Sequence, residues 1–171
     1  MLIILALIIF WKIFFTGKIK KQSVRFPTWP YKLIYSDEKN FTAGSKILLS
    51  QKYNLSGKPD LIYQNIFTKN LIVVELKSCK RGDKKDLRSG DFLQLVSYFI
   101  IVEDCLQIKP RRGYLIYSDC MFRVPNKKKF RTQVFDSLKK MRAMLKNSNL
   151  EHKKNFAVCK NCICHNSVCD K

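Results

Sequence analysis

The fold predicted from the sequence rests on the stretch Leu71-Ile72-Val73-Val74-Glu75-Leu76-Lys77. It is apolar and β-branched apart from two charges, which is typical of a strand in the middle of a sheet. Glu75 and Lys77 stand two residues apart, so their side chains point to the same face of that strand. A charge in a buried strand is costly unless it is paired or binds a metal ion. The stretch therefore predicts a polar site on one face of a sheet.

A second carboxylate lies upstream in Ser56-Gly57-Lys58-Pro59-Asp60, at the start of another predicted strand. If the two strands are neighbours, Asp60 joins Glu75 on one face. Two carboxylates and the backbone carbonyl oxygen of Leu76 make an oxygen-rich site that suits Mg²⁺ or Mn²⁺. Such a cation polarises a phosphate and lowers the pKa of a bound water, while Lys77 orients that water or stabilises the developing charge. The alternative is a surface ion pair between Glu75 and Lys77 on an edge strand.

The rest of the chain alternates predicted strands and helices. A helix is expected over Asp91–Cys105, where apolar residues recur with helical spacing. Gln94 and Tyr98 are four residues apart and share one face of this helix. They either contact DNA or the carboxylates, or form the solvent face. A second amphipathic helix is expected over 129–147, with an apolar face of Phe130, Val134, Leu138, Met141 and Leu145. The other expected strands are Lys32–Asp37, Lys46–Gln51, Pro59–Tyr63, and a hairpin of Tyr114–Tyr117 with Met121–Val124.

Three motifs in this order resemble a known family. Gly57-Lys58-Pro59-Asp60, Val74-Glu75-Leu76-Lys77-Ser78 and Gln94-x-x-x-Tyr98 are similar to motifs of the PD-(D/E)XK nuclease superfamily. The likeness is to its RecB-like branch, which includes the CRISPR-associated "Cas-four" exonucleases. It implies an α/β fold, a restriction-endonuclease-like mixed β-sheet flanked by helices, and Mg²⁺- or Mn²⁺-dependent phosphodiester cleavage. It also implies that Asp60 and Glu75 are metal ligands, that Lys77 is the catalytic lysine, and that Gln94 and Tyr98 form an additional helix motif.

The sequence departs from the branch at one ligand. The branch usually has an early His or Glu as a further metal ligand, whereas both histidines of this chain, His152 and His165, lie far downstream. Asp37 is the substitute that the sequence offers. Its alternative role is that of a turn residue in Asp37-Glu38-Lys39-Asn40.

The end of the chain is rich in cysteine. Four of the seven cysteines fall in the last thirteen residues, as Cys159-x-x-Cys162-x-Cys164-His165-x-x-x-Cys169. Thiolates at this density suit zinc or an iron–sulfur cluster. Completion of the site by Cys164, His165 or His152 favours zinc. The resemblance instead implies a 4Fe-4S cluster held by Cys159, Cys162, Cys169 and a cysteine nearer the N-terminus. A disordered tail with free thiols is the remaining alternative.

The charge of the chain points to an acidic partner. Lys and Arg number 33 against 13 Asp and Glu, a formal net charge of +20, which favours nucleic acid or an anionic membrane surface as a partner. Residues 121–171 alone hold 13 Lys and Arg and 3 Asp and Glu. A solvated helix face accounts for some of these residues but not for the imbalance. The predicted DNA-backbone contacts are Lys127, Lys128, Lys129, Lys139, Lys140 and Arg142.

The first residues predict a membrane anchor. Residues 1–15 carry Lys12 as their only charge, and a helix extended to Ile19 would be about 28 Å long, close to the hydrocarbon core of a bilayer. A cleaved signal peptide usually has a basic start and a small-residue cleavage site, and neither is present. The Lys-rich sequence that follows places the C-terminal domain in the cytoplasm by the positive-inside rule, on a single-pass protein of the inner (cytoplasmic) membrane.

The predicted organisation has four parts: an anchor over 1–19, a basic linker over 20–34, a nuclease-like domain over 35–150 and a metal-binding tail over 151–171. The predicted function is that of a membrane-anchored, metal-dependent DNA nuclease, of exonuclease type. The alternatives are a catalytically inactive, membrane-tethered nucleic-acid-binding protein with a structural metal site, and a small structural metal-binding membrane protein.

Overall fold

A computed structural model of the 171-residue chain describes residues 21–22, 29–38, 46–82 and 86–146. The predicted anchor over 1–19 and the predicted metal tail over 151–171 lie outside the described residues. The chain divides into two units, Met1–Val134 and Phe135–Lys171.

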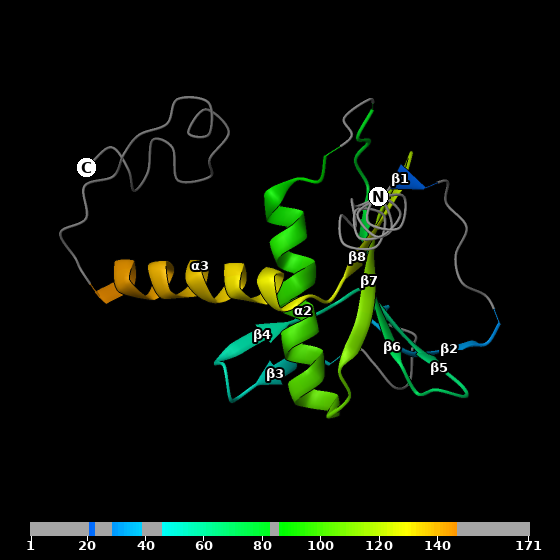
Figure 1. Cartoon of the computed structure of the whole chain (residues 1–171), viewed down its shortest axis with the longest axis horizontal. Coiled ribbons are helices and arrows are strands. Elements are labelled where there is room, and N and C mark those ends of the chain that lie inside the picture. Colours follow the sequence, from blue (N-terminus) through cyan, green and yellow to red (C-terminus); the bar gives the residue numbers. More distant parts are fainter. Residues whose placement is uncertain (1–20, 23–28, 39–45, 83–85, 147–171) are drawn as a thin grey trace, which may run out of the picture. The chain divides into compact units, whose positions relative to one another are not determined.

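The first unit is built on a six-stranded mixed sheet in the order β1-β8-β7-β6-β5-β2 (Figure 1). Only β6 and β7 run parallel, and every other neighbouring pair is antiparallel. A second, two-stranded sheet pairs β3 with β4. This is the mixed α/β architecture that the sequence predicts. The strands are β1 Lys21–Gln22, β2 Tyr31–Ser36, β3 Leu48–Ser50, β4 Leu55–Gly57, β5 Leu61–Asn65, β6 Leu71–Lys77, β7 Pro110–Tyr117 and β8 Met121–Pro125.

Strand β6 is buried between two neighbours, as its composition predicts. All its residues from Leu71 to Glu75 are buried, and the strand becomes exposed at Leu76. On one side its last pair with β5 is Val74 with Leu61. On the other side its pairing with β7 continues to Lys77, opposite Tyr117. The ladder with β5 therefore ends before Leu76 and leaves one edge of β6 open there.

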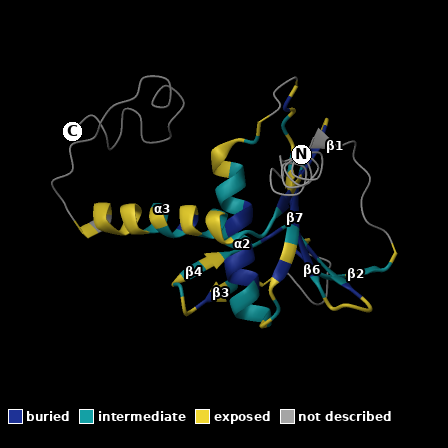
Figure 2. Ribbon diagram, viewed as in Figure 1, coloured by how far each residue is buried: buried dark blue, intermediate teal, exposed yellow. Residues whose placement is uncertain are grey.

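Helix α2 (Ser89–Leu106) is the crossover that the parallel pair β6 and β7 requires. It packs on β3, β4, β6 and β7, and its middle is buried (Figure 2). Close contact depends on Gly113 of β7, since a Cβ there would lie 2.7 Å from Phe99 Cε1. The buried residues of the helix are Leu95, Val96, Phe99, Ile100, Ile101 and Val102.

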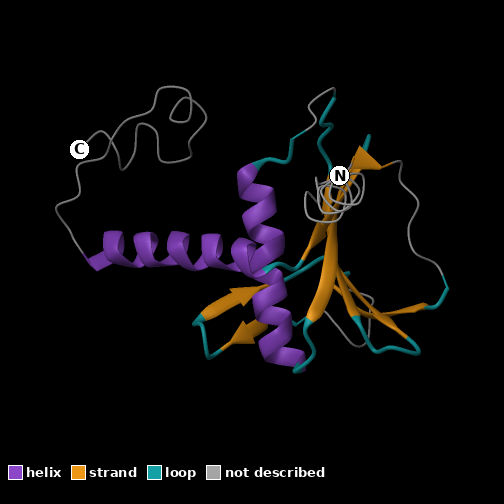
Figure 3. Ribbon diagram, in the orientation of Figure 1, coloured by secondary structure: helices purple, strands orange, loops and turns teal. Residues whose placement is uncertain are grey.

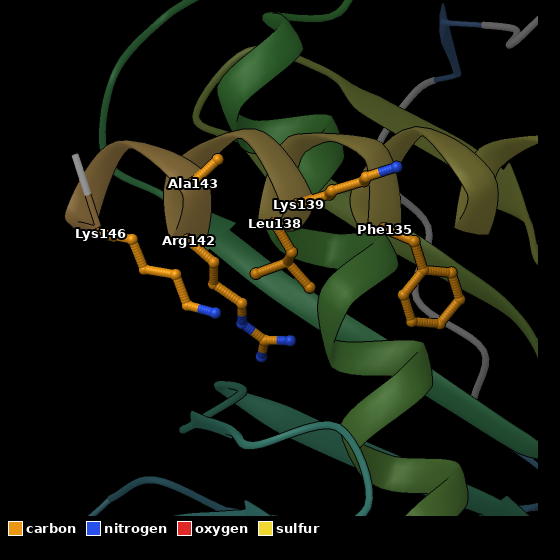
Figure 4. A pocket seen from close by; sticks show the side chains of 6 residues that line it. All are labelled: Phe135, Leu138, Lys139, Arg142, Ala143 and Lys146. Atoms are coloured by element: carbon orange, nitrogen blue, oxygen red, sulfur yellow. The ribbon is translucent and has the colours of Figure 1, made fainter. Parts of the chain in front are cut away.

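Helix α3 (Lys128–Lys146) follows β8 and crosses the boundary between the units. In the first unit Val134 is buried, and the Phe130 ring meets Phe92 edge-on, with centroids 5.0 Å apart. In the second unit the helix carries a hollow of about 360 Å³ (Figure 4). Met141 is 59% exposed, so the predicted apolar face is not buried along its whole length. The hollow is lined by Phe135, Leu138, Lys139, Arg142, Ala143 and Lys146.

Most predicted elements are present, with boundaries shifted by a few residues. Two short strands were not predicted: β1, inside the expected linker, and β4. β2 begins at Tyr31, so the sheet extends upstream of the boundary expected at residue 35. Neither described helix is both long and apolar enough to cross a membrane.

Candidate active site

Five side chains predicted from the motifs come together at one end of the main sheet. Glu75 and Lys77 close β6, and Asp60 directly precedes β5. Gln94 lies in the first half of α2 and Tyr98 four residues further on, and the helix starts at this end of the sheet and runs along it (Figure 3). The sheet register thus brings together carboxylates that are fifteen positions apart in the sequence.

The carboxylate of Glu75 is the most buried charged group of the site, with the residue 5% exposed. Its Oε1 accepts a hydrogen bond from Lys77 Nζ at 3.0 Å and another from Gln94 Nε2 at 2.7 Å. Its Oε2 is buried and has no hydrogen-bond partner among the residues that the structure describes. Burial raises the pKa of Glu75 to about 7, the bond from Lys77 opposes this rise, and the charge of Asp60 adds to it. An orphaned buried carboxylate oxygen is costly unless a proton or a cation occupies it.

Lys77 is held among acceptors. Its ammonium donates to Gln94 Oε1 at 2.7 Å, besides the bond to Glu75, and lies 3.5 Å from Asp91 Oδ1. Burial by itself lowers the pKa of Lys77, but the hydrogen bond and charge of Glu75 and the charge of Asp91 outweigh it and raise the pKa above its ordinary value. The side chain therefore stays positively charged and directed into the site.

Asp60 reaches the open edge of β6. Its Oδ2 accepts a hydrogen bond from the Leu76 backbone N–H at 2.5 Å. Burial raises the pKa of Asp60, the Leu76 bond opposes the rise, and the charge of Asp37 adds to it. In an antiparallel ladder a residue presents its N–H and C=O to the same side. The Leu76 carbonyl therefore faces the same side as its N–H, toward Asp60, at the place where β5 has ended.

Gln94 links the two charged side chains of β6. Its Nε2 donates to Glu75 Oε1 and to the Tyr98 hydroxyl at 2.9 Å, while its Oε1 accepts from Lys77. The structure thus places Gln94 against the site and Tyr98 against Gln94, and not on a solvent face. Gly57 makes room for this arrangement, because a Cβ there would lie 2.7 Å from Tyr98 Cε1.

Asp37 lies at the margin of the site. Its backbone N–H donates to the Asp60 carbonyl at 3.0 Å. Its carboxylate Oδ2 is 4.0 Å from Lys58 Nζ, which also donates to the Asp37 carbonyl at 3.0 Å. The side chain is 39% exposed. Asp37 therefore contributes negative charge near Asp60 and is itself next to a lysine.

Two site residues had not been identified from the sequence. Asp91, the first residue of the helix expected over Asp91–Cys105, contacts both Lys77 and Tyr117, whose hydroxyl donates to Asp91 Oδ2 at 2.6 Å. Tyr117 is 1% exposed and gave no sequence signal beyond a strand position. Burial, followed by the hydrogen bond to Asp91, raises the pKa of Tyr117 far above its ordinary value.

The donor atoms fit a hard divalent cation. The orphaned Glu75 Oε2, the Asp60 carboxylate and the Leu76 carbonyl are all oxygens, which Mg²⁺ and Mn²⁺ prefer. Over the residues that the structure describes, no group of three or more His, Cys, Asp or Glu side chains is placed to hold a metal ion.

The other predicted site residues divide between the units or fall outside them. Lys127, Lys128 and Lys129 belong to the first unit, and Lys139, Lys140 and Arg142 to the second. All except Lys127 are exposed. The predicted ligands of the tail lie outside the described residues: His152, Cys159, Cys162, Cys164, His165 and Cys169.

Comparisons with known proteins add little. No protein-family model matches the chain, and no curated protein is significantly similar to it. A solved structure titled "Crystal structure of SSO0001" is similar at 21% sequence identity, with a TM-score of 0.43. The match covers 95% of this chain and 65% of that chain, so this chain spans less than two thirds of that protein. A likeness at this level carries no argument about fold or function.

Proposed function

We propose that the protein is a divalent-metal-dependent nuclease that hydrolyses phosphodiester bonds in DNA. The observation that carries the proposal is the buried Glu75 Oε2, which has no hydrogen-bond partner in the described part of the chain, although Glu75 lies beside the Asp60 carboxylate and the Lys77 ammonium. Such a cluster is expensive to build for stability alone. The ordered motifs around Asp60, Glu75–Lys77 and Gln94–Tyr98 also resemble those of the PD-(D/E)XK nucleases and support the same chemistry.

Each residue has a role in this proposal. Asp60, Glu75 and the Leu76 carbonyl would hold Mg²⁺ or Mn²⁺. When bound, this cation supplies positive charge that polarises a phosphate and lowers the pKa of a bound water. Lys77 keeps its proton and stabilises negative charge that develops on the phosphate oxygens. Gln94 fixes the distance between Glu75 and Lys77 through its two amide atoms. Tyr98 in turn fixes the Gln94 amide.

Affinity for DNA comes from other residues. The chain has an excess of twenty positive charges, and exposed lysines occupy both ends of α3. Contacts of this kind bind phosphates without regard to base sequence and weaken as the salt concentration rises.

Exonuclease-type cleavage, as in the RecB-like branch, is the expected mode. The apolar run 1–15 supports attachment to the cytoplasmic membrane, and the cysteine-rich tail supports a 4Fe-4S cluster or zinc, which visible absorption would distinguish.

A second candidate is a nucleic-acid-binding protein that does not cut. The observation in its favour concerns Asp37, the substitute that the sequence offers for the further His or Glu ligand of the nuclease branch. Its carboxylate is beside Lys58 and more than a third exposed. A site with two carboxylate ligands binds its cation more weakly than one with three.

The proposal is tested with the full chain in detergent, on single- and double-stranded DNA, with Mg²⁺ or Mn²⁺. The protein should cleave, and Lys77→Ala should lower kcat on the order of 10²-fold, because one preorganised electrostatic group is lost. The matched control is Lys32→Ala, which removes an exposed lysine from the edge strand β2. It should cleave like the wild type.

Two results would contradict the proposal. If the wild type binds DNA but cuts neither substrate with either cation, the protein is the non-cutting binder. If Lys77→Ala cuts as fast as the wild type, the catalytic centre lies elsewhere.

A further inference from the structure

The Lys77 ammonium is paired with the carboxylate of Glu75, which is also a proposed ligand of the metal ion. It donates to Glu75 Oε1 at 3.0 Å and to Gln94 Oε1 at 2.7 Å. An ammonium has three donors, and among the residues that the structure describes Asp91 Oδ1 lies near it as a further acceptor, at 3.5 Å. The shorter ion pair of Lys77 is therefore the one with Glu75.

The Asp91 carboxylate is held in place by a second partner, Tyr117. Its second oxygen, Oδ2, accepts the Tyr117 hydroxyl proton at 2.6 Å. Tyr117 is buried at 1% exposure and lies directly opposite Lys77 in the register of β6 and β7. Because its hydroxyl remains protonated, Tyr117 can only donate to Asp91. One oxygen of Asp91 thus has a strong donor, and the other faces Lys77.

The charges in this cluster are unequal. Asp60, Glu75 and Asp91 are three carboxylates around one ammonium, and the charge of each acts on its neighbours. The fully ionised cluster therefore has two negative charges in excess, which one divalent cation would neutralise. Glu75 and Asp60 would hold such a cation close to the ammonium, and its charge would weaken the pair of Lys77 with Glu75.

We propose that Asp91, held by Tyr117, is the positioning residue that keeps Lys77 in the site when a divalent cation takes up the carboxylate of Glu75. The inference rests on the proposed function and goes beyond it, since it assigns a second carboxylate to the lysine and not to the metal. Tyr117 acts through Asp91, and Asp91 acts through Lys77. Neither is expected to touch the metal ion or DNA.

The experiment compares Asp91→Asn and Tyr117→Phe with two matched controls in the full chain. Asp104→Asn makes the same change on α2 away from the site, and Tyr114→Phe makes the same change on β7. Three quantities are measured: kcat, the Kd for Mn²⁺, and the rate at which an acylating reagent labels the Lys77 amine, by mass spectrometry with and without Mg²⁺. Thermal unfolding checks that each variant is folded.

Asp91→Asn should lower kcat about tenfold and change the Kd for Mn²⁺ by less than about threefold. Labelling of Lys77 in the presence of Mg²⁺ should rise about fivefold, equivalent to ~1 kcal/mol of lost ion pairing. Tyr117→Phe should shift both quantities in the same direction by a smaller factor, and the controls should behave like the wild type.

Three outcomes overturn the inference. The first is labelling and kcat of Asp91→Asn equal to those of the wild type, which would show that Glu75 and Gln94 suffice. The second is loss of Mn²⁺ binding by Asp91→Asn, which would make Asp91 a ligand. The third is a change in the controls as large as that in the variants, which would make the effect structural. Failure of the nuclease proposal is distinguishable: the wild type then does not cleave, while the labelling pattern still reports on Lys77.

Discussion

Two buried polar side chains lie at opposite ends of the β5–β6 hairpin, and their partners differ. Asn65, 8% exposed, stands at the turn, and Glu75, 5% exposed, stands near the open end. Asn65 Oδ1 accepts the backbone N–H of Phe67 at 3.0 Å and of Thr68 at 2.8 Å. Glu75 has its partners on another residue of its strand and on α2, and its Oε2 has none within the described ranges.

The difference separates a structural from a functional polar group. The Asn65 oxygen is satisfied by backbone groups two and three residues away, so it stabilises the turn and has little capacity left for a ligand. Glu75 Oε2 is a buried acceptor without a partner among the described residues. This lowers stability unless a proton or a cation binds there. Mutations at the two ends should therefore have opposite consequences for stability and activity.

The largest expected effect is on activity, from Glu75→Gln. The variant keeps the size of the side chain but loses the charge that holds a cation, so cation-dependent cleavage should fall by on the order of 10³-fold or more. DNA binding should be almost unchanged, because the lysines supply it. Cleavage rates and Mn²⁺ titrations measure the change, with Glu103→Gln on α2 as the control. Retained cleavage would mean that Glu75 is, like Asn65, only structural.

The next effect is on stability as a function of pH. The pKa of Glu75 is about 7 in the folded protein against 4.5 as the reference for the unfolded chain, so between these values the folded state binds more protons. The free energy of unfolding of the metal-free protein should therefore be highest near pH 4.5 and fall as the pH rises to about 7, by roughly 3 kcal/mol.

Urea denaturation at a series of pH values measures this slope. Glu75→Gln has no titrating group at position 75 and should lose the part of the slope that Glu75 contributes, and saturating Mg²⁺ should reduce it in the wild type. A slope that is the same in both proteins would exclude Glu75 as its source.

A smaller loss, of stability alone, is expected for Asn65→Ala. Two backbone N–H groups lose their acceptor, which should cost about 2 kcal/mol of unfolding free energy. Cleavage per folded molecule should stay unchanged, because the turn is at the far end of the hairpin from Asp60. The control is Asn70→Ala in the same turn, where the lost bond is exposed. Impaired cleavage by folded Asn65→Ala would show that the two ends are coupled.

The smallest effect is expected for Tyr98→Phe. Gln94 Nε2 loses its bond to the hydroxyl but keeps its bond to Glu75, so kcat should fall about threefold and stability change by less than ~1 kcal/mol. Steady-state kinetics and thermal unfolding measure the two quantities. A loss as large as that of Lys77→Ala would give Tyr98 a direct part in the chemistry.

Several features could be predicted from the sequence because they depend on neighbours along the chain. The β-branched run predicted β6 with its bounds, and the apolar spacing predicted α2 and α3 within two residues. The short strands β1 and β4 lack such a pattern, since two or three residues give too little periodicity. The apolar spacing of α3 also did not reveal that Met141 is exposed, because spacing places a residue on a face but not against a partner.

The sequence by itself determined the strand Leu71–Lys77 and the shared face of Glu75 and Lys77, because the period of a strand is fixed by its backbone. It left open whether Gln94 and Tyr98 contact the carboxylates or face solvent. Only the tertiary structure decided that question, together with the bond from Leu76 to Asp60 sixteen residues away and the bond from Tyr117 to Asp91 across twenty-six. These contacts depend on strand register and on how closely α2 packs on the sheet, and neither is encoded in the local pattern of residues.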